Sequence, residues 1–471
     1  MPLRLAVRDI AFFERPVRFA RPFRFGAVVI VATPQLFVRA EVEIEGKGKE
    51  KGRFVGAGAE LLVPKWFDKR AHLSPEQTVD ELRRSLEIAR GLYLASSGFE
   101  SAFGLHASRI AGQIEACAKE DIPPLAAAYG PAELDKAILD GLLRGIGVNF
   151  FDGMAGNIAG VDARLSRDLG DNDIAQFLAR RRRLDRVAIR HTVGLDDRIE
   201  GTCGVVDTNE NAGARYFKLK LNGDPDADAA RLIRIGRELA TLPHDYRVTL
   251  DANEQYADLA GLSTLVERLD RDSALSPIAE KLLYIEQPMP RDITRASPLG
   301  ALAARDFIID EADDSYDAFL SARALGYRGI SSKSCKGIYK SIVNATRAAK
   351  WSAEGGTFFV TAEDLTCQAG LGVQQDLALG ALIGVTHAER NGHHYVDGFG
   401  DTPVDEAAAF LAAHPDLYTR SRQTIRLAIH DGDLLTGSLT SPGFASSVHP
   451  EWSTMSPLQQ PKAKNLQEQS L

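Results

Sequence analysis

The sequence has few cysteines, no excess of positive charge and no long apolar run. Its four cysteines, at positions 117, 203, 335 and 367, form no CxxC pair, which argues against a disulfide framework or a zinc site and favours a reducing compartment. The formal net charge is −8, whereas proteins that bind nucleic acid usually carry a basic surface. No stretch approaches the roughly 18 continuous apolar residues of a membrane span. We therefore expect neither a nucleic-acid partner nor a membrane partner.

The composition is that of an ordinary globular protein. Hydrophobic residues make up 44% of the chain and charged residues 25%, which is enough apolar material for a large core. A length of 471 residues suits two or three domains, or one barrel with an appended domain. The first five residues contain no apolar segment of the kind that secretory signals carry, so we expect a cytoplasmic protein.

The opening third of the chain mixes strand and helix patterns. β-branched residues fill 26–31, and apolar and polar residues alternate over 36–44, with a turn expected between them at Thr33-Pro34. Ser74-Pro75 is a suitable helix start, and apolar residues with helical spacing follow it. Further helices are expected near 105–120 and 131–146. Residues 1–130 therefore read as an α+β region without a regular strand–helix repeat.

From about residue 186 short apolar strands alternate with helices. Eight strand candidates follow one another, at 187–193, 216–221, 248–251, 282–286, 307–310, 328–333, 358–361 and 385–389. Strands separated by helices in this way build a (β/α) barrel, and no Gly-rich dinucleotide fingerprint follows the first strand. We predict an α/β fold with a TIM-like barrel over 131–424. Residues 449–471, rich in Ser, Pro, Gln and Lys, are expected to form a poorly ordered tail.

Three acids end successive strands of this repeat, namely Asp251, Glu286 and Asp310. Each acid alone could equally cap the helix that follows it. Because the carboxyl ends of barrel strands meet at one mouth, the three carboxylates together would crowd one spot and repel one another. A hard divalent cation relieves that repulsion, and Mg²⁺ fits the oxygen donors best. Asn253 and Glu311 lie close enough to support the site, although Glu311 should face away from Asp310 because alternate strand residues point to opposite sides.

Lysines end two strands on either side of these acids. Lys218 and Lys220 share one face of the second strand, and Lys333 ends the sixth. Taken alone, the first pair could belong to a solvated edge strand. In a barrel mouth, mutual repulsion and partial burial should lower the pKa of one lysine and make it a usable base. Lys336, three places further on, should face away from Lys333. The second and sixth of eight strands lie on opposite sides of a barrel, so the two lysines would flank a metal-bound substrate.

The last two strands end in further polar residues. Glu363 and Asp364 follow the seventh strand. His387 and Glu389 share a face of the eighth and are candidate substrate contacts. The adjacent pair at 393–394 is not expected to bind a metal, because neighbouring residues on an extended chain point opposite ways.

The run KLK, LDAN, IEQP and IDEA, followed by a lysine on the sixth strand, resembles the enolase superfamily and specifically its muconate-lactonizing-enzyme subgroup. The resemblance implies an N-terminal α+β capping domain over 1–130, completed by residues 425–448, on a (β/α) barrel. Residues 21–26 are similar to the loop that closes over the substrate, where Arg21 or Arg24 could pair with a distal carboxylate. The sixth-strand sequence, Lys333-Ser334-Cys335-Lys336-Gly337-Ile338, departs from the usual pattern of apolar residues and paired glycines. The ends of the last two strands also lack the acidic pair of dipeptide epimerases and the His–Asp dyad of mandelate racemase.

Carried over by motif, the resemblance implies Lys220 as a catalytic acid/base beside Lys218, with Lys333 as the opposing catalytic lysine. It implies Mg²⁺ as the cofactor, and its ligands by motif are Asp251, Glu286 and Asp310. Asn253 joins the candidate substrate contacts Glu363, Asp364, His387, Glu389, Arg21 and Arg24.

The implied reaction removes the proton α to a carboxylate through an ene-diolate intermediate. A racemase, epimerase or cycloisomerase acting on a small carboxylate is the leading interpretation, in a homo-oligomer. Two alternatives stay open within the fold: a dehydratase of acid sugars or hydroxy acids, and a non-catalytic scaffold that binds metal. A Mg²⁺ lyase or aldolase on an unrelated barrel is a third, and it predicts a broken C–C bond in the product.

Overall fold

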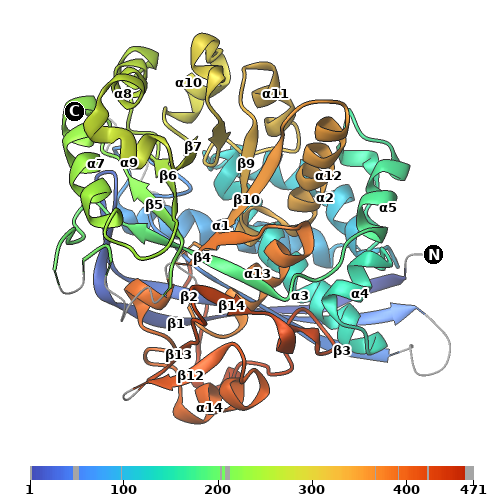
Figure 1. Ribbon diagram of the computed structural model, residues 1–471. Coiled ribbons are helices and arrows are strands. Elements are labelled where there is room, and N and C mark those ends of the chain that lie inside the picture. The colour runs from blue at the N-terminus through green and yellow to red at the C-terminus, as the bar shows by residue number, and fades with distance from the viewer. Residues whose placement is uncertain are drawn as a thin grey trace, which may run out of the picture.

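An antiparallel sheet with helices covers one end of a closed parallel barrel (Figure 1). The computed structural model describes residues 3–45, 52–96, 98–201, 204–206, 213–365, 368–390, 392–421 and 424–461. Within these ranges no helix is both long enough and apolar enough to cross a membrane.

The cap is built on a long hairpin. Strand β1 (Arg4–Phe25) pairs with β2 (Val28–Glu45), which pairs with β3 (Gly52–Leu61), and β15 (Ser456–Pro457) adds to the other edge of β1. The turn between β1 and β2 contains Gly26 in the left-handed conformation, with φ of 52°. The turn expected at Thr33-Pro34 is wrong, because β2 pairs with β1 without interruption from Val17↔Thr33 to Pro16↔Pro34 and beyond.

Helices α1 (Pro75–Leu94) and α3 (Pro124–Ile146) pack on this sheet, and α2 (Ala102–Ala118) packs against both of them. As expected, Ser74 caps α1: its side chain accepts the amide of Gln77 in a capping box, and Pro75 is the first helical residue. Helix α3 lies so close to β3 that a Cβ on Gly56 would be 2.0 Å from the carbonyl oxygen of Ala137, so only glycine fits there. Because α3 packs on β2 and β3 and spans residue 130, we propose to place the cap–barrel boundary after this helix.

The barrel confirms the eight strands expected from the sequence and the predicted fold class. Its parallel strands among the described residues are β4 (Arg186–Val193), β5 (Tyr216–Lys220), β6 (Arg247–Asp251), β7 (Leu282–Glu286), β8 (Phe307–Ile309), β9 (Gly329–Ser332), β10 (Phe359–Glu363) and β11 (His387–Glu389). They neighbour one another in chain order, and the pairing of β11 with β4 closes the ring. Figure 1 shows the helices that alternate with them around the outside.

The remaining α-helices among the described residues are α4 (Phe150–Ala155), α5 (Asp171–Ala179), α7 (Pro225–Leu239), α8 (Leu259–Arg271), α9 (Ser276–Ala279), α10 (Arg291–Ala296), α11 (Ala318–Ala324), α12 (Ile338–Ala353), α13 (Leu371–Ile383) and α14 (Val404–Ala413). Every residue of α13 is buried, because this helix packs between β10 and the cap strand β3.

The end of the chain returns to both parts of the molecule. A hairpin of β12 (Tyr418–Ser421) and β13 (Thr424–Leu427) leads to β14 (Asp433–Leu435), which pairs antiparallel with β4 of the barrel. The amide of Phe444 then donates to Asp140 of α3 at 2.6 Å. Residues 449–461, expected to begin a poorly ordered tail, instead form a 3₁₀ turn (Trp452–Thr454) and β15, whose Pro457 pairs with Phe13. The rest of the expected tail lies outside the described residues.

Candidate active site and metal centre

The charged residues predicted from the sequence meet at the carboxyl ends of the barrel strands. Register places them in one layer, because Lys220 pairs with Asp251 and Asp251 with Glu286. On the other side of the ring, Glu363 pairs with Glu389. In a parallel barrel, side chains at this height point into the mouth from neighbouring strands. The mouth is therefore lined with lysines and carboxylates rather than with apolar groups.

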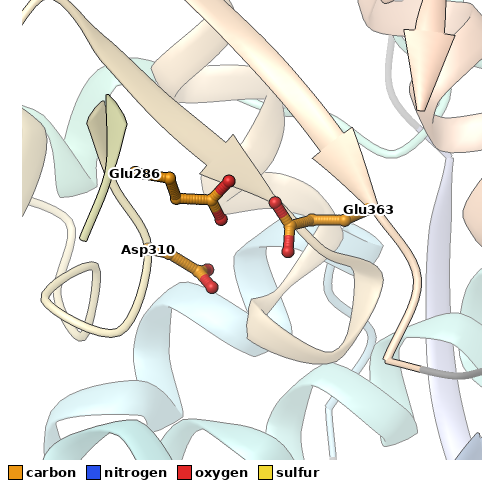
Figure 2. A group of neighbouring side chains, drawn as sticks. All are labelled: Glu286, Asp310 and Glu363. Carbon is orange, nitrogen blue, oxygen red and sulfur yellow. The ribbon is translucent and has the colours of Figure 1, made fainter. Parts of the chain in front are cut away.

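Three carboxylates form the tightest acidic group among the described residues. Glu286, Asp310 and Glu363 are buried, and each offers an oxygen within 4.8 Å of the other two. Figure 2 shows the three side chains pointing toward one another from β7, the end of β8 and β10. Oε1 of Glu363 has no hydrogen-bond partner, and Oε2 of Glu286 lies 3.0 Å from the ammonium of Lys218. A buried carboxylate oxygen without a donor is costly, and hard oxygen donors suit Mg²⁺. The group is therefore suited to binding Mg²⁺.

This acidic group overlaps the predicted ligand set without matching it. Asp251, predicted from its motif, instead contacts two lysines, with Oδ2 at 2.6 Å from Lys220 Nζ and 2.9 Å from Lys218 Nζ. Those lysines outweigh the effect of burial and lower the pKa of Asp251 to about 2. Glu363, expected as a substrate contact, takes its place in the group. The role of Asp251 as a ligand stays a prediction.

Lys218 lies at the centre of the carboxylates. Its Nζ is 2.8 Å from oxygens of Glu363 and Glu389, 3.0 Å from Glu286 and 2.9 Å from Asp251, and the side chain is fully buried. Burial alone lowers a lysine pKa, but the four acids outweigh it and raise the pKa of Lys218 well above its usual value. The expected lowering of a lysine pKa is therefore wrong for this residue, because neighbouring acids matter more than the second lysine.

The pKa values of two carboxylates in the mouth are shifted in opposite directions. Burial, followed by repulsion from Glu363, raises the pKa of Glu286 well above its usual value. Glu363 shows the reverse: Lys218 and Lys333 outweigh burial and hold its pKa well below the usual value. The repulsion expected between crowded carboxylates therefore raises the pKa of Glu286 and not that of Glu363.

On the far side of the mouth two lysines share Asp310. Lys333 Nζ lies 3.0 and 2.9 Å from the two oxygens of Asp310 and also contacts Glu363. Asp310 and Glu363 outweigh burial and raise the pKa of Lys333 well above its usual value. Lys336 Nζ is 3.0 Å from the same carboxylate. The expectation that Lys336 faces away is wrong, because residues 334–336 form a 3₁₀ turn and strand parity ends at Ser332.

The two candidate catalytic lysines lie on opposite sides of the barrel. Lys220 belongs to β5 and Lys333 follows β9, and the sheet order places β6, β7 and β8 between them. Each lysine lies near an aromatic ring from the cap. Lys220 Nζ is 6.0 Å from the centre of Phe23, and Lys333 Nζ is 5.1 Å from that of Trp66. Cation–π contacts of this kind hold an ammonium in place. Phe23 lies within residues 21–26, which the resemblance assigns to the closing loop, whereas no sequence pattern singled out Trp66.

A cap loop also reaches the mouth through Lys69. Its Nζ contacts Glu254 at 2.8 Å and Glu311 at 2.7 Å, and donates to the carbonyl oxygen of Asn253 at 3.0 Å. Asn253 and Glu254 both have positive φ, at 44° and 73°, a conformation that non-glycine residues rarely adopt without support. Lys69 therefore holds the segment that follows Asp251. A lone lysine in a loop gives no sequence signal for this role.

The remaining candidates lie in three different settings. Asn253 donates to Glu311 at 3.1 Å, so both support the rim of the site. Glu389 contacts Thr192 and Lys218 inside the barrel. Asp364 is buried 3.9 Å from Arg390.

His387, the first residue of β11, lies at the opposite end of its strand from the mouth. It stacks on Tyr216 at 4.1 Å between ring centres, and Arg190 lies 3.0 Å from its Nδ1. Burial and Arg190 lower its pKa to about 3, so it stays neutral. Arg21 and Arg24 are on β1, where Arg24 forms an exposed ion pair with Asp196 at 3.0 Å. The structure thus brings neither His387 nor Arg24 to the carboxylates.

No protein-family model matches the chain, and a comparison with curated proteins finds no match. Solved structures do match along nearly the whole length. A dipeptide epimerase from Enterococcus faecalis V583, complexed with Mg and the dipeptide L-Leu-L-Tyr, aligns with a TM-score of 0.56 and 15% identity over 93% of this chain and 99% of its own. An enolase-superfamily member from Roseovarius nubinhibens ISM, complexed with magnesium, gives a TM-score of 0.58 and 17% identity over 97% of this chain and 99% of its own.

A muconate lactonizing enzyme from Pseudomonas fluorescens, complexed with muconolactone, gives a TM-score of 0.57 and 17% identity over 94% of this chain and 97% of its own. At identities this low, the similarity shows a shared fold. The chain therefore has the fold seen in the enolase superfamily, a closed eight-stranded parallel barrel with an N-terminal capping sheet.

Proposed function

We propose that this protein is a Mg²⁺-dependent enzyme that removes the proton α to the carboxylate of a small acid, and that its overall reaction is a racemisation, epimerisation or cycloisomerisation. The observation that carries the proposal is the placement of Lys220 and Lys333 on opposite sides of one buried carboxylate cluster. Two lysines that flank a substrate can act on its two faces.

Three side chains would hold the metal: Glu286, Asp310 and Glu363, with Asp251 as the further ligand expected from its motif. Bound Mg²⁺ would supply a Lewis acid that stabilises negative charge on the substrate carboxylate. These carboxylates already contact the ammoniums of Lys218 and Lys333, and Oε1 of Glu363 lacks a hydrogen-bond donor.

The lysines have separate tasks in this proposal. Lys220, which contacts one carboxylate and the ring of Phe23, takes or returns a proton at one face. Lys333 does the same at the other face, beside Trp66. Lys218, surrounded by four acids, stays charged and fixes their positions beside Lys220. The cap closes the mouth to water through Phe23, Trp66 and Lys69.

Similar folds support this class of reaction, since a dipeptide epimerase and muconate lactonizing enzymes are among them. A dehydratase would share the first proton abstraction and differ in its product. A homo-oligomer and a small carboxylate substrate remain part of the proposal.

Exchange of the α-proton in D₂O tests it. The protein is incubated with Mg²⁺ and a panel of amino acids, dipeptides, hydroxy acids and sugar acids, and deuterium uptake is followed by NMR. We expect uptake into at least one acid, dependent on Mg²⁺ and lost with EDTA. Mg²⁺ binding without exchange in any acid would favour the scaffold, and loss of water from the acid would favour the dehydratase.

A further inference from the structure

A cavity of about 350 Å³ lies outside the carboxylate cluster, between the loop that follows β4 and helix α7. Its charged lining consists of three arginines, Arg198, Arg231 and Arg234, and one acid, Asp197. The other lining residues are Leu195, Ile199, Ala227 and Ala230. Neither the motifs nor the proposed reaction uses this cavity.

The single acid of the lining already has partners. Asp197 accepts the amide of Gly194 and the hydroxyl of Tyr395, both at 2.7 Å, and its Oδ2 lies 3.6 Å from His394 Nε2. None of these contacts involves an arginine of the cavity. Asp197 thus forms its hydrogen bonds with Gly194 and Tyr395, and it acts on Arg231 only through its charge, as the acid that most raises the pKa of this arginine.

Arg231 joins the cavity to the barrel mouth. Its two terminal nitrogens donate to main-chain carbonyls, at 3.0 Å to Lys220 and 2.6 Å to Gly194. A guanidinium has five N–H donors, so these two bonds leave donors over, and no carboxylate among the described residues forms an ion pair with it. Burial lowers the pKa of Arg231 more than nearby acids raise it, as expected for a cation with too little compensating charge.

The other two arginines are also weakly paired. Arg198 is exposed, and no described residue forms a hydrogen bond or ion pair with it. Arg234 has only 3.4 Å contacts with one oxygen of Glu200, and both side chains are more than half exposed. Three guanidinium groups thus face a cavity whose one acid is engaged elsewhere.

We propose that this cavity binds a phosphate group, either free or carried by a small ester. Guanidinium forks match the oxygens of phosphate, and charge-assisted hydrogen bonds are the strongest in proteins. A dianion suits these three arginines better than a monoanion does, because among the described residues only Glu200 forms an ion pair with any of them. The two carbonyl contacts hold Arg231 rigid, which prepares the site before a ligand arrives. Its bond to the Lys220 carbonyl places the phosphate site next to a candidate catalytic strand.

Calorimetry with inorganic phosphate on the full chain tests the proposal. The titration is done in EDTA at constant ionic strength, so that phosphate cannot bind through a metal at the mouth, and chloride serves as the reference anion. Wild-type protein should bind phosphate with a stoichiometry of one. The double substitution R198A/R234A should weaken binding at least about tenfold, because each lost charge-assisted contact is strong. Both residues are exposed, so the variant should fold like the parent.

R237A is the matched control. Arg237 lies on the same helix α7 and does not line the cavity, so its loss should leave phosphate binding unchanged. R231K provides a second variant, which keeps the charge and removes the fork, and it should weaken binding as well. Absence of phosphate binding by the wild type at millimolar concentration would overturn the proposal, as would equal losses in R198A/R234A and R237A. Glycerol phosphate separates the two sources: tighter binding than phosphate indicates an ester, and equal or weaker binding indicates free phosphate.

Discussion

Two buried networks of charged and polar residues differ in the groups to which their members bond. The mouth network consists of the lysines and carboxylates at the barrel strand ends: Lys218, Lys220, Asp251, Glu286, Asp310, Lys333, Glu363 and Glu389. The interface network joins the cap to the barrel: Glu60, Glu133, Lys136, Ser334, Asp376 and Arg390. In the mouth network lysines bond mainly to side chains. In the interface network several bonds end on main-chain groups, such as Lys136 to the Ala59 carbonyl and the Ser334 amide to Asp376.

This difference indicates different tasks. Bonds between long side chains can rearrange around a cation or a substrate, whereas bonds to main-chain groups fix two elements relative to each other. Both networks carry a desolvation cost, and removing one member leaves another charge exposed to that cost. We therefore expect variants of the mouth network to change chemistry more than stability, and variants of the interface network to do the opposite.

The largest expected effect comes from the two flanking lysines. Either K220M or K333M should lower turnover by roughly 10²- to 10⁴-fold, the usual contribution of a general acid or base. In an epimerase, α-proton exchange should survive on one face in each variant, and the surviving face should switch between the two. Deuterium uptake into each stereoisomer, followed by NMR, measures this. In a cycloisomerase or dehydratase exchange should disappear in one variant alone. Exchange on both faces in both variants would refute the assignment of these lysines.

The next effect concerns the metal. E286Q removes one charge from the acidic group at constant shape, and Mg²⁺ affinity should fall by at least about tenfold, since even outer-sphere partners cost about 10- to 100-fold. D251N measures whether the carboxylate that now contacts Lys218 and Lys220 also serves the metal. Calorimetry on the metal-free protein gives both affinities, with the exposed E267Q as the control. Unchanged Mg²⁺ affinity in both variants would contradict the site.

Lys69 links the cap to the mouth network, so its loss should change both the stability of the protein and its kinetics. K69M removes one donor from Glu311 and one of the two side-chain donors from the carbonyl of Asn253, which keeps its bond from Gln255. We expect the free energy of unfolding to fall by about 1–3 kcal/mol, the cost of an unsatisfied buried group, and KM to rise because the cap loop loses its hold on the mouth. Urea denaturation and steady-state kinetics measure the two effects. The control is K119M, since Lys119 forms an exposed pair with Glu115 on α2. A change in stability with unaltered KM would place Lys69 in the interface network instead.

The smallest effect is a pH dependence of stability from the interface network. Burial outweighs the nearby Lys136 and raises the pKa of Glu133 from 4.5 to about 8. Between these values the folded protein holds a proton that the unfolded chain releases. Stability therefore falls as pH rises from 4.5 to 8, with a slope of up to about 1.4 kcal/mol per pH unit.

E133Q should remove that slope and leave turnover unchanged. Urea denaturation between pH 5.5 and 7.5 measures it, and the exposed E115Q is the control. An identical pH slope in E133Q and the parent would show that Glu133 does not carry the effect.

Local pattern was sufficient to place most of the barrel. Strands β5, β6 and β7 are short runs that end in a charge, so these strands and their terminal Lys220, Asp251 and Glu286 could be found from the sequence alone. Asp310 and Glu311 have different partners: Asp310 contacts Lys333 and Lys336, which follow β9, whereas Glu311 contacts Lys69 of the cap and Asn253. Strand parity failed at Lys336, where the chain leaves the strand for a 3₁₀ turn.

The sequence by itself determined the strand–helix repeat and the charged residues that end the strands, because both follow from hydrophobic spacing along a short stretch of chain. Only the tertiary structure decided which charges meet. Closure of the ring brings Glu363 of β10 beside Glu286 and Asp310, and surrounds Lys218 with four acids, so that its pKa rises instead of falling. The cap adds Phe23, Trp66 and Lys69 from segments about 150 or more residues away in the chain. Contacts and pKa values of this kind depend on distances through space, and one-dimensional spacing does not contain them.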